Sequence, residues 1–127
     1  MRELTGHKVN PANDVLKVMV MDEPGSGGAN HQYQIEIPPP ASEASHSTAT
    51  RYAINFQNGP IAEAGVNGLT HEALLAILID RMEGFQAGPY ASPDNQEALD
   101  AMRTAQTALQ RRTKARMARG VEGTHAV

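Results

Sequence analysis

The chain has 127 residues, a formal net charge of -3 and no cysteine. This length favours one domain with a modest core, residues 1–127, and the lack of cysteine excludes a disulfide framework, a zinc–thiolate site and a thiol nucleophile. The first residues have no apolar signal-peptide core, and no apolar run approaches the roughly 20 residues of a membrane helix. We therefore expect a soluble cytoplasmic protein.

Residues 1–66 are expected to form a small antiparallel sheet. Residues 15–21 are rich in β-branched side chains, and apolar residues alternate with polar ones in 31–37 and again in 51–57. The glycine-rich stretch 23–30 is interpreted as a connecting loop, because a phosphate-binding loop needs a following Gly-Lys-Ser/Thr and a helix, and neither is present.

Two further segments complete this part of the chain. Residues 38–50 begin with three prolines and are polar thereafter, which predicts a flexible surface loop. Asn58-Gly59 predicts a turn into residues 60–64, which are expected to form a short edge strand. The sheet would then have three or four strands and one apolar face for the helices to cover.

Residues 67–127 are expected to form a two-helix antiparallel hairpin and a tail. The first helix should run over 71–87 with Thr70 as its N-cap, and the second from the N-cap Ser92 to about Arg119. Apolar side chains cover well over half of the first helix, so in a small protein it should be covered on more than one side. The sequence predicts an oligomeric α+β fold.

The second helix ends in a basic segment, residues 109–120, which we call the basic end. It holds five of the eleven lysines and arginines: Arg111, Arg112, Lys114, Arg116 and Arg119. Arg112, Arg116 and Arg119 share one helical face, and three guanidinium groups on a face suit a phosphate. The alternative is that these cations complement the helix dipole and stay solvated, and spacing alone favours neither interpretation.

The residues argue against three other functions. A two-histidine phosphodiesterase needs two His-x-Ser/Thr motifs, whereas the chain has one, at His46, and the five histidines show no helical i, i+4 pair for a metal. Two phenylalanines, three tyrosines and no tryptophan are few aromatics for a protein that binds a nucleic-acid polymer. A small protein-interaction module that uses the face of the helical hairpin remains the alternative function.

Six sequence blocks lie in order over nearly the whole chain: Gly6-His-Lys-Val-Asn10, Asp22-Glu-Pro-Gly-Ser-Gly-Gly-Ala29, Asn55-Phe-Gln-Asn-Gly-Pro-Ile61, Gly65-Val-Asn-Gly-Leu-Thr70, Gly84-Phe-Gln-Ala-Gly-Pro89 and Arg119-Gly-Val-Glu-Gly-Thr124. They resemble the phage Thoeris anti-defence sponges of the first described type, which share a helical hairpin with the phage anti-CBASS sponges. The resemblance implies a protein that is not an enzyme and sequesters, uncleaved, a cyclic ADP-ribose isomer made by a host TIR-domain enzyme. It also implies the bacterial host cytoplasm as location, with no cofactor, metal ligand, membrane or nucleic-acid polymer.

The resemblance further implies a set of ligand-binding residues. The roles of the family's pocket fall on Phe85, Asn95, Arg112 and Arg116, and Arg119 shares the face of the two arginines. Phe85 would stack on adenine, Asn95 would hydrogen-bond the ribose or the base, and the arginines would hold the pyrophosphate.

A second nucleotide site is expected at Arg103 and Thr107, which share a face of the second helix. Some family members also hold cyclic di- or trinucleotides in a hexamer, and copies of this pair around a three-fold axis would suit such a ligand. The assembly would then be a homodimer or a trimer of dimers. The alternative is that Arg103 pairs with Asp100 or Glu97 on the exposed helix surface.

Overall fold

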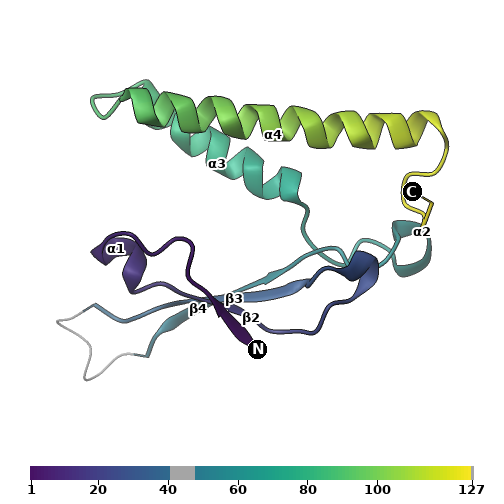
Figure 1. The fold of residues 1–127 in the computed structure, drawn as a ribbon, viewed down its shortest axis with the longest axis horizontal. Coiled ribbons are helices and arrows are strands. Elements are labelled where there is room, and N and C mark those ends of the chain that lie inside the picture. The colour runs from purple at the N-terminus through teal and green to yellow at the C-terminus, as the bar shows by residue number, and fades with distance from the viewer. Residues whose placement is uncertain (41–47, 127) are drawn as a thin grey trace. The chain divides into compact units, whose positions relative to one another are not determined.

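The computed structural model describes residues 1–40 and 48–126. The chain forms two compact units, Met1–Gly59 and Pro60–Val127, of which the first holds the sheet and the second the two long helices (Figure 1). The expected flexible loop 38–50 falls in large part on residues 41–47, which lie outside the described residues. The expectation of a single domain stays a prediction.

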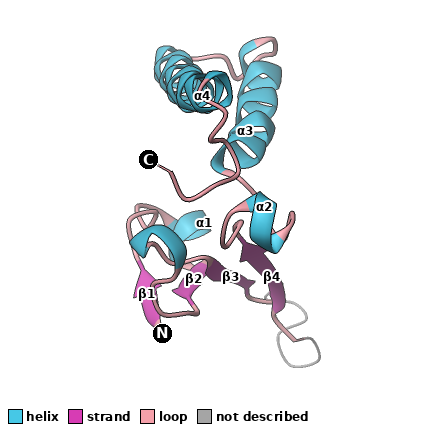
Figure 2. Cartoon of the chain, turned by 90° about the vertical axis from the view of Figure 1, so that its right-hand side faces the viewer, coloured by secondary structure: helices cyan, strands magenta, loops and turns pink. Residues whose placement is uncertain are grey.

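The first unit is built on a four-stranded antiparallel sheet whose strands follow one another in chain order (Figure 2). The strands are β1 (Arg2–Leu4), β2 (Lys17–Val20), β3 (Gln32–Ile37) and β4 (Thr50–Asn55). The register sets Val20 opposite Tyr33, and Tyr33 opposite Ile54. Because opposite residues of paired strands share a face, the apolar side chains gather on one side of the sheet, and Val20 there is 1% exposed.

The glycine-rich stretch joins β2 to β3, as predicted, and is tied down by polar contacts. It contains a 3-10 turn, η1 (Ser26–Gly28). The backbone N–H of His31 donates to the Asp22 carboxylate, 3.0 Å from N to Oδ2, and the His31 ring Nε2 lies 2.9 Å from the Ser26 carbonyl oxygen. The Asn30 amide donates to the Asp22 carbonyl oxygen at 2.7 Å. These contacts give the loop a fixed conformation.

The prediction of an edge strand over residues 60–64 was wrong, because the segment is a single helical turn, α2 (Ile61–Ala64). The φ of Pro60, -67°, already suits a helix start, and two alanines follow within the turn. Gly65 ends the turn at a φ of 68°, which favours glycine.

The strand that completes the four-stranded sheet is β1, not residues 60–64. The sequence did not indicate it, because β1 has three residues and is too short to show a periodicity. A short helix that the sequence also did not indicate, α1 (Pro11–Asp14), lies between β1 and β2.

The second unit confirms the predicted helices as α3 (His71–Gln86) and α4 (Pro93–Ala118). The Thr70 hydroxyl accepts a hydrogen bond from the Ala73 N–H at 3.1 Å, which makes Thr70 the N-cap of α3. The helices lie side by side (Figure 1), and the Gln106 amide of α4 donates to the Glu72 carbonyl oxygen near the start of α3 at 3.2 Å. Because α4 has 26 residues against 16, its basic end continues past the start of α3.

The two helices bury few of their apolar side chains. No residue of α3 is buried, and in α4 only Leu99 and Arg116 are. On α3, Ile77 and Leu78 are 64% and 49% exposed. The apolar face of α3 is therefore largely uncovered in the single chain, and the expected self-association stays a prediction. Among the described residues, no helix is long and apolar enough to cross a membrane.

Candidate functional site

Phe85 and Asn95 lie at the end of the hairpin where residues 87–92 connect α3 to α4, which we call the connector end. The Asn95 N–H donates to the Ser92 hydroxyl at 3.1 Å, and its side-chain amide donates to the Tyr90 carbonyl oxygen at 3.2 Å. Gln86 adds two hydrogen bonds to the Ser92 backbone, of 3.0 and 3.1 Å. The connector is thus fixed by side chains from both helices, with Asn95 partly exposed beside it.

The Phe85 ring has a neighbour that the sequence interpretation did not include. The guanidinium carbon of Arg81 lies 4.9 Å from the ring centroid, and Phe85 remains 36% exposed. The spacing of these residues, i and i+4 on one helix, is a signal that could have identified the pair.

Arg116 lies at the basic end and is 7% exposed, because the tail folds over it. Its Nε atom donates to Glu122 Oε2 at 3.0 Å, and Nη2 donates to the carbonyl oxygens of Val121 and Thr124 at 3.0 and 3.2 Å. Nη1 donates to the Ala126 carbonyl oxygen. The guanidinium is therefore engaged by the chain itself, a role that its helical spacing did not predict.

Arg112 and Arg119 differ from Arg116 in this respect. Both side chains are exposed, and neither makes a hydrogen bond or ion pair with residues 1–40 or 48–126. Arg112 sits one helical turn before Arg116, so its unengaged N–H donors and the charge of Arg116 lie close together. Chemically, Arg112 can hold an anionic group, while the charge of Arg116 one turn away is shared with the Glu122 carboxylate.

A single chain does not bring the expected ligand-binding residues together. Asn95 and Arg112 are 17 positions apart on α4, a straight 26-residue helix, which corresponds to about 25 Å at 1.5 Å per residue. No arginine side chain can reach across that distance. The connector end and the basic end therefore cannot contact the same nucleotide within one chain.

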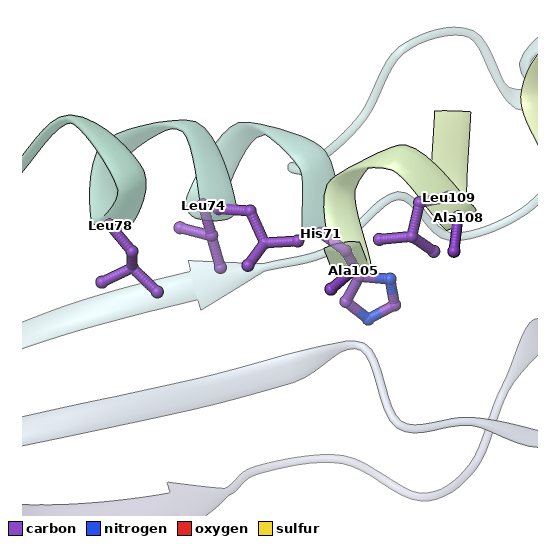
Figure 3. Close-up of a pocket in the computed structure, with 7 residues that line it drawn as sticks. His71, Leu74, Leu78, Ala105, Ala108 and Leu109 are labelled. Carbon is purple, nitrogen blue, oxygen red and sulfur yellow. The ribbon is translucent and has the colours of Figure 1, made fainter. Parts of the chain in front are cut away.

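Between these ends, α3 and α4 form an open apolar groove of about 600 Å³ (Figure 3). Its lining residues are His71, Leu74, Leu75 and Leu78 from α3 with Ala105, Ala108 and Leu109 from α4. Such a surface suits a complementary apolar helix better than a charged small molecule.

Arg103 and Thr107 are both exposed on α4. The Arg103 guanidinium lies 3.6 Å from Glu83 Oε2 and 3.9 Å from Asp100 Oδ1. For the alternative to a nucleotide site, Asp100 and Glu97 were the two expected partners of Arg103. The ion pair with Asp100 is formed, whereas Glu83 of α3 takes the place of Glu97. Exposed pairs of this length are weak, so Arg103 is accessible to an anionic ligand.

The groups expected of other function classes are not assembled in the described part of the chain. It contains no group of three or more histidine, cysteine, aspartate or glutamate side chains placed to hold a metal ion. His46, which carries the single His-x-Thr motif, lies outside the described residues.

Comparison with known proteins assigns part of the chain to a family. The family described as Acb2/Tad1, hairpin domain, matches residues 49–114. The protein "Thoeris anti-defense 1" of Bacillus phage SBSphiJ7 is 42% identical over 72 residues, which are 57% of this chain and 51% of the relative. The chain thus spans about half the length of the curated relative it matches. With its two packed helices and this match over half of its length, the chain belongs to the Acb2/Tad1 hairpin-domain family.

Proposed function

We propose that this protein is a phage anti-Thoeris sponge, which binds a cyclic ADP-ribose isomer in the cytoplasm of the bacterial host and withholds it without cleaving it. The name of its relative, Thoeris anti-defense 1, supports the role. The residues assigned to the ligand support the mode of action, because an aromatic ring, a carboxamide and guanidinium groups bind and orient a nucleotide. The site uses no catalytic residue, metal or cofactor.

The observation that carries the proposal is a stripe along α4 with a residue proposed to bind the nucleotide at each end. Asn95 and Arg112 are separated by alternating steps of three and four residues, and Arg116 follows four residues later. At about 100° per residue, Ala105, Leu109, Arg112 and Arg116 fall within about 60° of one another around the helix. Asn95 lies about 60° from Arg116, at the margin of this stripe, and Ala105 and Leu109 also line the groove.

Two copies complete the pocket if their hairpins pair antiparallel along this stripe. A two-fold axis crossing α4 midway between Asn95 and Arg112, near residues 103 and 104, brings Asn95 of one copy beside Arg112 of the other. The same pairing covers the apolar groove of each copy. The pocket then combines Phe85 and Asn95 with the partner's arginines, so the proposed homodimer is the unit that binds the ligand.

Within such a pocket the arginines have different roles. Arg112 offers unengaged donors to the pyrophosphate, whereas Arg116 supplies positive charge one turn away while its donors hold the tail. Arg119 adds a third cation at the rim.

Nucleotide release tests the function directly. The purified protein is incubated with cyclic ADP-ribose isomers, washed, and heat-denatured, and the supernatant is analysed by chromatography. Recovery of the intact nucleotide in proportion to the protein supports a sponge. A new product makes the protein an enzyme, and the absence of any retained nucleotide favours the protein-interaction module, which would use the groove for another protein.

Cross-linking tests the antiparallel pairing. Because the chain has no cysteine, Ala105→Cys places one thiol in the groove near the proposed axis, and a short bismaleimide should join two copies efficiently. The control is Thr107→Cys, an exposed site away from the groove stripe, which should cross-link poorly. Equal yields from the two variants would contradict this pairing.

A second nucleotide site at Arg103 and Thr107 remains part of the proposal. Both residues lie away from the groove stripe, so dimer formation would leave them available for cyclic di- or trinucleotides. Three dimers around a three-fold axis would give each phosphate of a cyclic trinucleotide an equivalent Arg103.

A further inference from the structure

Arg81 is a charged residue of α3 that contacts the Phe85 ring and is not among the assigned ligand-binding residues. Its guanidinium carbon lies 4.9 Å from the centroid of the Phe85 ring. Arg81 is exposed, and among the described residues it makes no hydrogen bond or ion pair, so this ring is its only neighbour of note. Of the arginines near the expected ligand, Arg116 has its donors occupied by the tail, whereas those of Arg81 are available.

The surroundings of the ring leave part of it open. Phe85 is 36% exposed although Arg81 lies against it. Gly88, three positions later in the connector, has no side chain that could cover the ring. A Cβ atom added at Gly84 would meet nothing within 4 Å. Neither glycine carries a side chain that could obstruct a planar base approaching the ring.

We propose that Arg81 is a positioning residue of the nucleotide site, in that its guanidinium covers one face of the Phe85 ring and thereby fixes the ring for a purine to stack on the open face. This inference rests on the proposed function. A planar cation over an aromatic face is attracted by the ring quadrupole, and it restricts the rotamers of an otherwise exposed side chain. A ring that is already held loses less conformational freedom when the base binds.

The arrangement is matched to a purine nucleotide. Guanidinium, phenyl ring and purine are all planar and can form one stack, with the cation on the outside. The ligand class is therefore a nucleotide that presents an unpaired purine face together with phosphate. A ligand without a base would gain nothing from Arg81.

The test is a double-mutant cycle on the affinity for cyclic ADP-ribose isomers, measured by calorimetry. Arg81→Gln is expected to weaken binding by roughly three- to tenfold. The same substitution should have no further effect in a Phe85→Leu background, since Arg81 acts through the ring. Arg51→Gln removes the same charge from β4 and serves as the control, with affinity unchanged.

The ring can be observed independently because the chain has only two phenylalanines. In protein with labelled phenylalanine rings, Phe85→Leu assigns the Phe85 signals, and Arg81→Gln should shift them in the free protein while those of Phe56 stay in place. If Phe85→Leu binds too weakly to complete the cycle, these ring signals decide the question.

The following results would contradict the role proposed for Arg81. Equal losses from Arg81→Gln in both backgrounds would mean that Arg81 contacts the ligand directly. Unchanged affinity, or unchanged Phe85 ring signals, would remove the positioning role and leave the proposed function intact. If the unaltered protein retains no nucleotide, the proposed function and this inference both fail.

Discussion

Arg116 and Glu122 form an ion pair, with 3.0 Å between Nε and Oε2, that joins the last turn of α4 to the tail. Arg116 also donates to the carbonyl oxygens of Val121, Thr124 and Ala126. The tail in turn reaches α2, since the Ala62 N–H donates to the Gly123 carbonyl oxygen at 3.1 Å. One guanidinium therefore organises the C-terminal part of the second unit.

We expect Arg116→Gln to release the tail without unfolding the hairpin. A shorter neutral side chain leaves the tail carbonyl groups without their charged donor, which should lower the free energy of opening the tail by about 1–3 kcal/mol. Hydrogen exchange should show faster exchange of the Ala62 and Thr124 amides, with α3 and α4 unaffected. Unchanged protection of both amides would contradict this role. The nucleotide affinity should also fall, because the pocket loses a charge.

Arg112→Gln should affect the ligand alone. Its side chain has no partner among the described residues, so the free energy of unfolding should change by less than about 0.5 kcal/mol. Loss of a charge-assisted contact with phosphate should weaken nucleotide binding at least tenfold, or about 1.4 kcal/mol. The matched control is Arg111→Gln, an exposed neighbour on a different side of the helix. Similar losses in the two variants would point to general electrostatic attraction instead of a defined contact.

Much of the fold could be predicted because its signals are local. Thr70 and Ser92 cap helices whose apolar spacing is regular, and residues 31–37 alternate as a strand does. The segments that were missed or mistaken are the shortest. β1 has three residues and depends on pairing with β2, whereas residues 60–64 follow a turn signal yet form a helical turn that contacts the tail.

Less of the candidate site than of the fold could be predicted from the sequence. Helical spacing correctly puts Arg112 and Arg116 one turn apart, but it does not reveal that Arg116 is buried by residues 121–126. Those contacts depend on how an irregular tail folds back, for which the sequence offers no periodicity. The distance between Asn95 and Arg112 could have been calculated from the helix length, and it already implies that the two residues cannot contact one nucleotide within a single chain.

The acid stability of the first unit should depend on Asp22. Partial burial raises the pKa of this carboxyl group, but hydrogen bonds from the backbone N–H groups of His31 and Gln32 and from Asn30 outweigh it, so the pKa lies below the usual 3.8. A lowered pKa in the folded state stabilises the protein above the unfolded value, and the stabilisation is lost as the pH falls through the folded value. Unfolding of the unaltered protein should therefore become easier as the pH falls from about 5 to below the usual value of 3.8.

Asp22→Asn should show a smaller change over this range, because asparagine does not titrate. Thermal unfolding at several pH values measures the difference, and Asp14→Asn, at an exposed position in α1, is the control. An equal pH dependence in the Asp22→Asn and unaltered proteins would show that another group controls acid unfolding.

Arg103→Glu separates the two proposed nucleotide sites. The ion pairs of Arg103 with Glu83 and Asp100 are exposed and long, so their loss should cost at most about 1 kcal/mol of stability. Binding of a cyclic trinucleotide should disappear, because a carboxylate repels each phosphate, while the affinity for the cyclic ADP-ribose isomer is kept. Titrations with both ligands test this, and an unaltered protein that sediments as a dimer with trinucleotide present would contradict the three-fold site.

Leu78→Glu tests whether the groove is the surface on which two copies meet. Leu78 lines the groove and is 49% exposed in the single chain, so a glutamate there should not prevent folding, which circular dichroism can verify. In the dimer the carboxylate would be buried against apolar side chains, and the dissociation constant should rise by roughly a hundredfold or more. Sedimentation velocity should detect monomers, whereas Leu78→Met should remain dimeric. Because the proposed pocket combines the connector end of one copy with the basic end of the other, nucleotide binding should be lost together with the dimer. A Leu78→Glu monomer with full nucleotide affinity would show that one chain forms the site by itself.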